Sequence, residues 1–368
     1  HQLSTLVLEG PGGESVTLTS DGPAALMIRR VEFDALLVSL AVEAGAELVT
    51  GADIVDAQAD SGGVELRSRD GRRFDADVVI AADGVHSVVG RRLGINPGWP
   101  DTAVALDMME EAPRTILRDL DPSTLWVAYG FDPAHAGAAR VGERRAAEGY
   151  AYIFPKRDHV NVGVGYVLRH FREAIDQSPY TLQRHFVDYL RRRGLVEGRS
   201  DRAHFTPFII PVGGPLARPG RGSVLLAGDA GGFVNGFTAE GIYYAMVSGE
   251  LAAYAVAEMR NATDGTLAER YRRACAAEIG AELRDSVLIQ RYLFADRARI
   301  GDVIRGAARS PALARLVVDY FTGRVPYGRV RRQILAAAPA FTIELCWSWL
   351  RTRWCGATGS GATTATSS

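Results

Sequence analysis

A glycine-rich segment that follows a hydrophobic run carries the strongest chemical signal in the sequence. Residues 224–244 read VLLAGDAGGFVNGFTAEGIYY, so Gly228 and Asp229 come directly after a predicted strand, and a helix is predicted to begin near Ala239. Small residues let a ligand approach the backbone, and the free amides of a helix start favour an anion. Asp229 can accept hydrogen bonds from sugar-like hydroxyl groups. Each glycine alone is equally well explained by a tight turn, but the whole combination indicates a nucleotide-type ligand.

Two further elements have the same strand-to-helix setting. Residues 81–87 read AADGVHS after a second hydrophobic run, and residues 30–34 read RVEFD ahead of a predicted helix. Asp83 and Gly84 form an ordinary turn pair when taken alone, and Ser87 suits an N-cap of the segment 88–93. Arg30 can reach a phosphate or a ring carbonyl, although a single arginine at such a place is more often a solvated surface residue.

Together these motifs resemble one superfamily. ADGVHS and AGDAGGF, with RVEFD upstream, resemble the flavoprotein hydroxylases and reductases built on the para-hydroxybenzoate hydroxylase fold. The longer stretches GDAGGFVNGFTAEGI and GYAYIFPKRDHVNVGVGY resemble the geranylgeranyl reductase branch. The resemblance covers about residues 25–257, and the helical last hundred residues add little to it.

The resemblance implies an FAD cofactor and a set of residues that contact it. The GD aspartate, Asp229, would bind the ribityl chain, and residues 235–241 would face the N1–C2 edge of the isoalloxazine, where reduced flavin is negatively charged. Asp83 and Gly84 match a motif near the pyrophosphate, and Arg30 matches an arginine that contacts the cofactor. The predicted cofactor-binding set is Arg30, Asp83, Gly84, Gly228, Asp229, Gly232, Asn235, Gly236, Thr238 and Gly241.

An alternating aromatic segment predicts the substrate pocket. Tyr150, Tyr152 and Phe154, followed by Pro155, would share one face of a strand. In the resembling family this segment forms part of the wall beside the flavin, with a tryptophan where this chain has Tyr152. An aromatic face suits an apolar isoprenoid chain, and alternation by itself equally fits an ordinary sheet packed on a helix. Tyr152 and His159 are the candidate proton donors, and the turn at Lys156 suits a phosphate head group or solvent.

Three functions compete at this point. The leading hypothesis is an FAD-dependent reductase that saturates double bonds of an isoprenoid or prenyl-lipid substrate, with NAD(P)H or another external reductant supplying electrons. The first alternative is a flavin monooxygenase or halogenase that acts on a small aromatic or polyketide substrate. The second is an inactive remnant, because no G-x-G-x-x-G fingerprint occurs and the RVEFD element starts only about thirty residues into the chain. We therefore expect the first βαβ unit to be missing from this chain, which would leave a sheet face uncovered.

The elements that must position these residues indicate fold class α/β (α+β). The predicted strands are 15–18, 25–28, 54–57, 64–67, 75–82, 103–109, 124–131, 150–154, 159–166 and 223–227. Helical periodicity covers 32–44, 182–193 and 241–260, and the chain is mostly helical after Leu267. We expect a partial Rossmann-like FAD-binding domain in 1–98 and 205–262, an inserted antiparallel-sheet substrate domain in 99–204, a helical region in 263–355 and a disordered tail in 356–368.

Composition excludes several other classes. The 368 residues are 47% hydrophobic and 23% charged, which is typical of a folded protein, and the net charge of −1 argues against nucleic-acid binding. The three cysteines lack metal-ligand spacing, so we expect a reducing, cytoplasmic setting and no metal site. Residues 341–354, FTIELCWSWLRTRW, suit either peripheral contact with a membrane or a helix docked on the core. The oligomeric state is left open.

Overall fold

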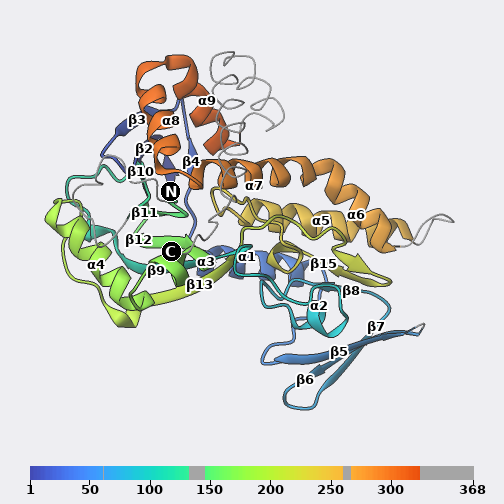
Figure 1. Cartoon of the computed structure of the whole chain (residues 1–368). Helices are drawn as coiled ribbons and strands as arrows, with labels where there is room; N and C mark the ends of the chain where they lie inside the picture. The colour runs from blue at the N-terminus through green and yellow to red at the C-terminus, as the bar shows by residue number, and fades with distance from the viewer. Residues whose placement is uncertain (61, 132–145, 260–266, 324–368) are drawn as a thin grey trace, which may run out of the picture.

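A computed structural model describes residues 1–60, 62–131, 146–259 and 267–323 of the chain (Figure 1). This described part contains four sheets and nine α-helices. The strands are β1 Gln2–Leu3, β2 Thr5–Glu9, β3 Ser15–Thr19, β4 Ala25–Leu26, β5 Ile54–Asp60, β6 Gly63–Ser68, β7 Arg73–Ala76, β8 Val79–Ala81, β9 Val104–Pro113, β10 Thr124–Tyr129, β11 Gly149–Pro155, β12 His159–Val167, β13 Phe205–Pro211, β14 Gly220–Arg221 and β15 Val224–Leu226. The helices are α1 Arg30–Glu43, α2 Val88–Arg92, α3 Leu168–Ala174, α4 Pro179–Arg192, α5 Ile242–Met259, α6 Leu267–Glu278, α7 Gly280–Phe294, α8 Arg297–Arg309 and α9 Pro311–Thr322.

The largest sheet has seven strands in the order β13-β9-β12-β11-β10-β2-β3. All neighbours are antiparallel except β10 and β2, which pair in parallel. Residues of β9 alternate between buried and partly buried positions, because successive side chains point to opposite faces. The antiparallel strands predicted within 103–166 are confirmed. The turn at 10–13 joins β2 to β3 as a hairpin, and this hairpin also belongs to the sheet.

Helices cover the two faces of this sheet (Figure 1). On one face α4 packs against β9 and β12, and Trp126 stacks on Phe186 with ring centroids 6.4 Å apart. On the other face Phe294, Ile304 and Tyr320, from α7, α8 and α9, form a core with the side chains of β2, β3 and β10. These helices pack on the β2, β3 and β10 end of that face, whereas Tyr150 and Phe154 on β11 and Asp107 on β9 stay partly exposed.

A second sheet, in the order β14-β15-β8, positions the glycine-rich segment. The sequence predicted one strand over 75–82, and this prediction is wrong: the chain breaks after Ala76, so β7 pairs with β6 and β8 pairs with β15. Ile80 is also 41% exposed, so β8 is not buried on both faces. The acidic residues Asp75 and Asp77 favour solvent over a buried central strand, which explains the break.

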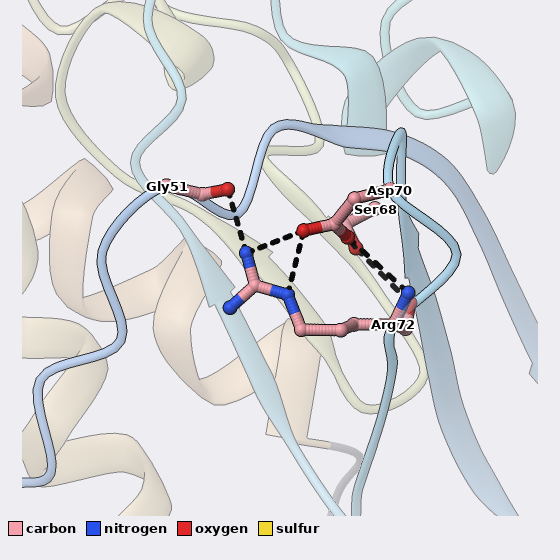
Figure 2. Close-up of polar contacts among 4 residues, drawn as sticks. All are labelled: Gly51, Ser68, Asp70 and Arg72. Carbon is pink, nitrogen blue, oxygen red and sulfur yellow. Dashed lines mark hydrogen bonds and ion pairs between the residues drawn. The ribbon is translucent and has the colours of Figure 1, made fainter.

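The third sheet is a small meander of β5, β6 and β7. The predicted strands 54–57 and 64–67 are confirmed, and they pair as a hairpin. Figure 2 shows how the turn after β6 is held: the Asp70 carboxylate accepts hydrogen bonds from Ser68 Oγ and from Arg72 Nε, the latter at 2.9 Å. Arg72 Nη2 also donates to the Gly51 carbonyl at 2.6 Å (Figure 2). These bonds connect the turn to the segment that precedes β5.

Helix α1 has an unusual surface. The predicted helix over 32–44 is confirmed, yet none of its residues is buried. Its apolar side chains are solvent-accessible, from Leu37 at 39% to Val31 at 71%. Apolar residues at helical spacing normally cover a core, so α1 exposes a surface of the kind that usually has a partner.

The division of the chain into five parts stays a prediction. Two elements outside the range 99–204, the β2–β3 hairpin and β13, also belong to the seven-stranded sheet. The tryptophan-rich segment 341–354 and the tail 356–368 lie outside the described residues. No helix in the described part of the chain combines the length and apolar composition that crossing a membrane requires.

Candidate functional site

The two dipeptide motifs of the sequence meet at one edge of a sheet. Strands β8 and β15 run in parallel, with Ala81 opposite Leu226, and the Ala227 amide donates to the Ala81 carbonyl at 3.0 Å. Asp83-Gly84 and Gly228-Asp229 follow these strands directly. The carboxyl ends of adjacent parallel strands are the usual place for a ligand in such sheets.

Arg30 lies near the same edge. Its guanidinium binds the Asp34 carboxylate, with Nε–Oδ1 and Nη2–Oδ2 distances both 2.8 Å. Burial raises the pKa of Asp229, and the positive charge of Arg30 acts on it in the opposite direction. The fold therefore brings the RVEFD and GD motifs together.

Asp83 has a structural task in addition to the predicted one. Its Oδ2 accepts hydrogen bonds from the amides of Val88 and Val89, at 2.7 and 3.1 Å. The N-cap predicted at Ser87 is confirmed, since its Oγ accepts from the Gly90 amide at 2.8 Å. These carboxylate and hydroxyl oxygens satisfy three amides at the start of α2, as capping side chains do. Contact of Asp83 with a cofactor stays a prediction.

Glycines in the loop are required by close packing. A Cβ on Gly232 would lie 2.6 Å from the Trp99 ring, and one on Gly236 would lie 2.8 Å from the Val212 carbonyl oxygen. Gly232 also has a φ of 75°, in the left-handed region. Tight turns and packing, the alternative that the sequence left open for each glycine, therefore apply at these two positions.

Asn235 holds the loop from inside. It is 1% exposed, and its Oδ1 accepts from the amides of Phe237 and Thr238, both at 3.0 Å. The Gly236 amide donates to Ser286 Oγ at 2.8 Å. These amides are engaged within the protein, so their predicted contact with a flavin edge has no support in the described contacts and stays a prediction.

The helix after the loop begins later than predicted. Helix α5 starts at Ile242, and Ala239, the predicted start, has a φ of 56°. This left-handed conformation is rare for a residue with a Cβ and is more common at functional sites. The Ala239 amide donates to the Asn235 carbonyl at 2.9 Å, which closes the turn.

The open side of the edge fits the hydroxylated half of a flavin. A Cβ on Gly241 would lie 3.5 Å from Asp229 Oδ1, so this glycine stands directly beside the carboxylate. Gly84 has a φ of 78°, and a Cβ there would meet no atom within 4 Å. A carboxylate with a glycine beside it suits a chain of hydroxyl groups. Residues of the G-x-G-x-x-G type, which would hold an ADP moiety, occur nowhere in the 368-residue sequence.

The aromatic residues predicted for the pocket do share a face. Ring centroids of Tyr150 and Tyr152 are 6.2 Å apart, and those of Tyr152 and Phe154 are 4.1 Å apart. The Tyr150 hydroxyl donates to the Thr238 carbonyl at 2.5 Å, which ties this face to the glycine-rich loop. Pro155 is buried at the end of β11.

The two proton-donor candidates lie apart. His159 begins β12, four residues before Gly163, which pairs with Tyr152. This offset is roughly 13 Å along the strand. Sequence reasoning missed a third group, Asp107 on β9, whose Oδ2 lies 2.9 Å from the Tyr152 hydroxyl. The only available signal was an acidic residue inside an otherwise apolar strand.

Lys156 places a positive charge directly after β11, the strand that carries the aromatic face. It is only 8% exposed, and burial lowers the pKa of its ammonium group, with Glu111 acting in the opposite direction. Arg29 Nε binds Glu111 Oε1 at 2.8 Å, so that carboxylate is shared with a second cation. In the described part of the chain Lys156 has no ion pair of its own, and an anionic group would satisfy it.

Comparisons with known proteins identify the family of the chain. A family profile described as "FAD binding domain" matches residues 2–285. Digeranylgeranylglycerophospholipid reductase 2 of Methanothermobacter thermautotrophicus is 28% identical over 301 residues, which cover 79% of this chain and 71% of that protein.

Two solved structures have the same fold. A geranylgeranyl bacteriochlorophyll reductase-like protein from Thermoplasma acidophilum superposes with a TM-score of 0.70 at 19% identity, over 91% of this chain and 83% of that one. The flavin-dependent brominase Bmp2 superposes with a TM-score of 0.62 at 17% identity, over 88% and 77%. At these identities the likeness concerns the fold alone.

Proposed function

The chain belongs to the FAD binding domain family and is an FAD-dependent oxidoreductase, and from this premise we propose that it saturates carbon–carbon double bonds of an isoprenoid lipid. The observation that carries the proposal is the aromatic face Tyr150–Tyr152–Phe154, tied by the Tyr150–Thr238 hydrogen bond to the loop beside Asp229. The relationship to digeranylgeranylglycerophospholipid reductases supports the substrate class.

The residues divide the work between cofactor and substrate. Asp229 would accept hydrogen bonds from the ribityl hydroxyls, with Gly84 and Gly241 leaving room for the chain. Bound and reduced, the flavin supplies the hydride that one alkene carbon receives. Tyr150, Tyr152 and Phe154 would pack against the apolar chain and exclude water from the reacting carbons. The buried ammonium of Lys156 suits an anionic head group at the end of the same face.

The activity assay uses the full chain loaded with FAD and reduced without oxygen by dithionite. Digeranylgeranylglycerophospholipid is added, and the lipid is analysed by mass spectrometry. Each saturated double bond adds the mass of two hydrogen atoms. Unchanged lipid in the presence of bound, reduced flavin contradicts the proposal.

Oxygen-dependent chemistry is the second candidate, because the motifs of the sequence left a flavin monooxygenase or halogenase as the alternative. The same protein is therefore incubated with oxygen, NADPH and the lipid. Insertion of oxygen into the substrate would favour a hydroxylase and overturn the reductase.

A flavin-binding measurement tests the placement of the cofactor separately. Asp229→Ala removes a charged acceptor, so we expect FAD affinity to fall roughly 10- to 100-fold, the equivalent of one or two hydrogen bonds to a charged group. Asp75→Asn, at an exposed carboxylate of the small sheet, is the matched control and should bind FAD like the parent. Equal affinity of the Asp229 variant and the parent would refute this placement.

A further inference from the structure

Two glycines on β12 let a tyrosine lie across the sheet. Gly163 stands between Tyr152 on β11 and Met109 on β9, and Gly165 stands between Tyr150 and Asp107. A Cβ on Gly163 would lie 2.4 Å from the Tyr152 hydroxyl oxygen. The phenol therefore occupies the space that a side chain would fill and extends over β12 towards β9.

After crossing β12, the Tyr152 side chain forms a hydrogen bond with the Asp107 carboxyl group on β9. The distance from the hydroxyl oxygen to Asp107 Oδ2 is 2.9 Å. Within the described residues no other hydrogen bond and no ion pair involves the Asp107 side chain. A carboxylate that loses much of its hydration and gains no cation is unfavourable, and the neutral acid is the form that such a site stabilises.

Burial accordingly raises the pKa of Asp107 to about 7, although the hydrogen bond from Tyr152 acts in the opposite direction. Tyr150 is the other titratable group that acts across this face. Desolvation raises the pKa of both tyrosines, so they stay protonated at neutral pH. The face therefore holds two phenols and a carboxyl that retains its proton up to near neutrality.

The pair lies beside the glycine-rich loop. Tyr150, next but one to Tyr152 on β11, donates to the Thr238 carbonyl, which belongs to the loop that follows Asp229. The ring of Tyr152 also stacks on Phe154, with 4.1 Å between the ring centroids. The hydroxyl is thus fixed by packing and by Asp107 on the face where the lipid would lie.

We propose that Tyr152 is the catalytic proton donor of the reductase and that Asp107 is the positioning residue that resupplies its proton. This inference rests on the proposed function. One alkene carbon receives the hydride, and the other takes the Tyr152 hydroxyl proton as the π bond breaks and two C–H bonds form. Asp107 transfers its proton to the phenol oxygen and is left as a carboxylate, which water reprotonates. The flavin loses two electrons, and the alkene gains two electrons and two hydrogens.

The kinetic test compares Tyr152→Phe and Asp107→Asn with the parent in single turnovers of reduced, lipid-loaded enzyme. General acids contribute on the order of 10²- to 10⁴-fold, so Tyr152→Phe should slow lipid reduction by at least about 100-fold with FAD affinity unchanged. The parent rate should fall as the pH rises through about 7, and Asp107→Asn should be slower and lose this pH dependence. Tyr129→Phe, at a buried tyrosine of the neighbouring strand β10, is the matched control and should retain the parent rate and pH profile.

A second readout needs no flavin. The carbonyl stretch of protonated Asp107, followed by difference infrared spectroscopy of the flavin-free chain, should disappear as the pH rises through about 7 and should be absent from Asp107→Asn. A parent that reduces the lipid no faster than Tyr152→Phe overturns this inference and leaves the proposed function intact. A parent that binds FAD and leaves the lipid unreduced overturns both.

Discussion

The partly buried carboxyl of Asp107 should make stability depend on pH in an uncommon direction. Its pKa is about 7 in the folded protein against 3.8 for an ordinary aspartate. Between these values the folded state holds a proton that the unfolded chain has released. Stability falls with rising pH wherever the folded state binds more protons, so the loss begins near the lower pKa and is complete above the upper one.

The size of the effect follows from the difference between the two pKa values. About three pKa units at 1.36 kcal/mol each correspond to roughly 4 kcal/mol of stability lost between about pH 4 and about pH 8. Asp107→Asn keeps a similar shape and an oxygen that can accept from Tyr152, but it does not titrate. Relative to the parent, the variant should therefore gain roughly 4 kcal/mol over the same pH range.

Urea unfolding at several pH values measures this difference, with the fluorescence of the buried Trp126 as the signal. Asp75→Asn again serves as control, because it removes an exposed carboxylate and should follow the parent curve. If the free-energy difference between Asp107→Asn and the parent is the same at acid and alkaline pH, the argument that Asp107 is buried as a neutral acid is refuted.

Four other substitutions test the packing around the site. Gly163→Ala forces a Cβ against the Tyr152 hydroxyl and should cost about 1–3 kcal/mol in urea unfolding, whereas Gly165→Ala, with 3.3 Å to its nearest atom, should cost clearly less. Ser87→Ala should lower the unfolding free energy by about 0.5–2 kcal/mol through loss of the α2 cap, and a parent-like value would count against the cap. Asn235→Ala leaves two loop amides without an acceptor and should cost at least about 1–3 kcal/mol by the same measurement, so an unchanged midpoint would contradict that role.

The local sequence pattern predicted most helices and strands correctly, but it predicted their first and last residues less well. The alternation of 150–154 correctly predicted a strand with its aromatic residues on one face. The glycine–aspartate pair after 224–226 correctly predicted a turn at the end of a strand. Both predictions succeeded because they depend on residues close together in the sequence. The predicted strand 75–82 failed because it joined the acidic residues at its start to the apolar run after them, whereas the chain changes sheets at Asp77. Helix α1 shows the same limit: its periodicity predicted the helix, but no local signal reports that its apolar side is exposed.

The sequence by itself was sufficient to identify the family, the cofactor class and the motifs that lie together beside Asp229, because each of these depends on short contiguous stretches of residues. Tertiary structure alone decided that Asp107 meets Tyr152. The two residues are 45 positions apart and come within 2.9 Å because the glycines of the intervening strand β12 leave room for the Tyr152 ring to reach across it. Cross-strand distance and loss of solvent are collective properties of the folded sheet, and they turn an ordinary aspartate into a carboxyl that holds its proton near neutral pH.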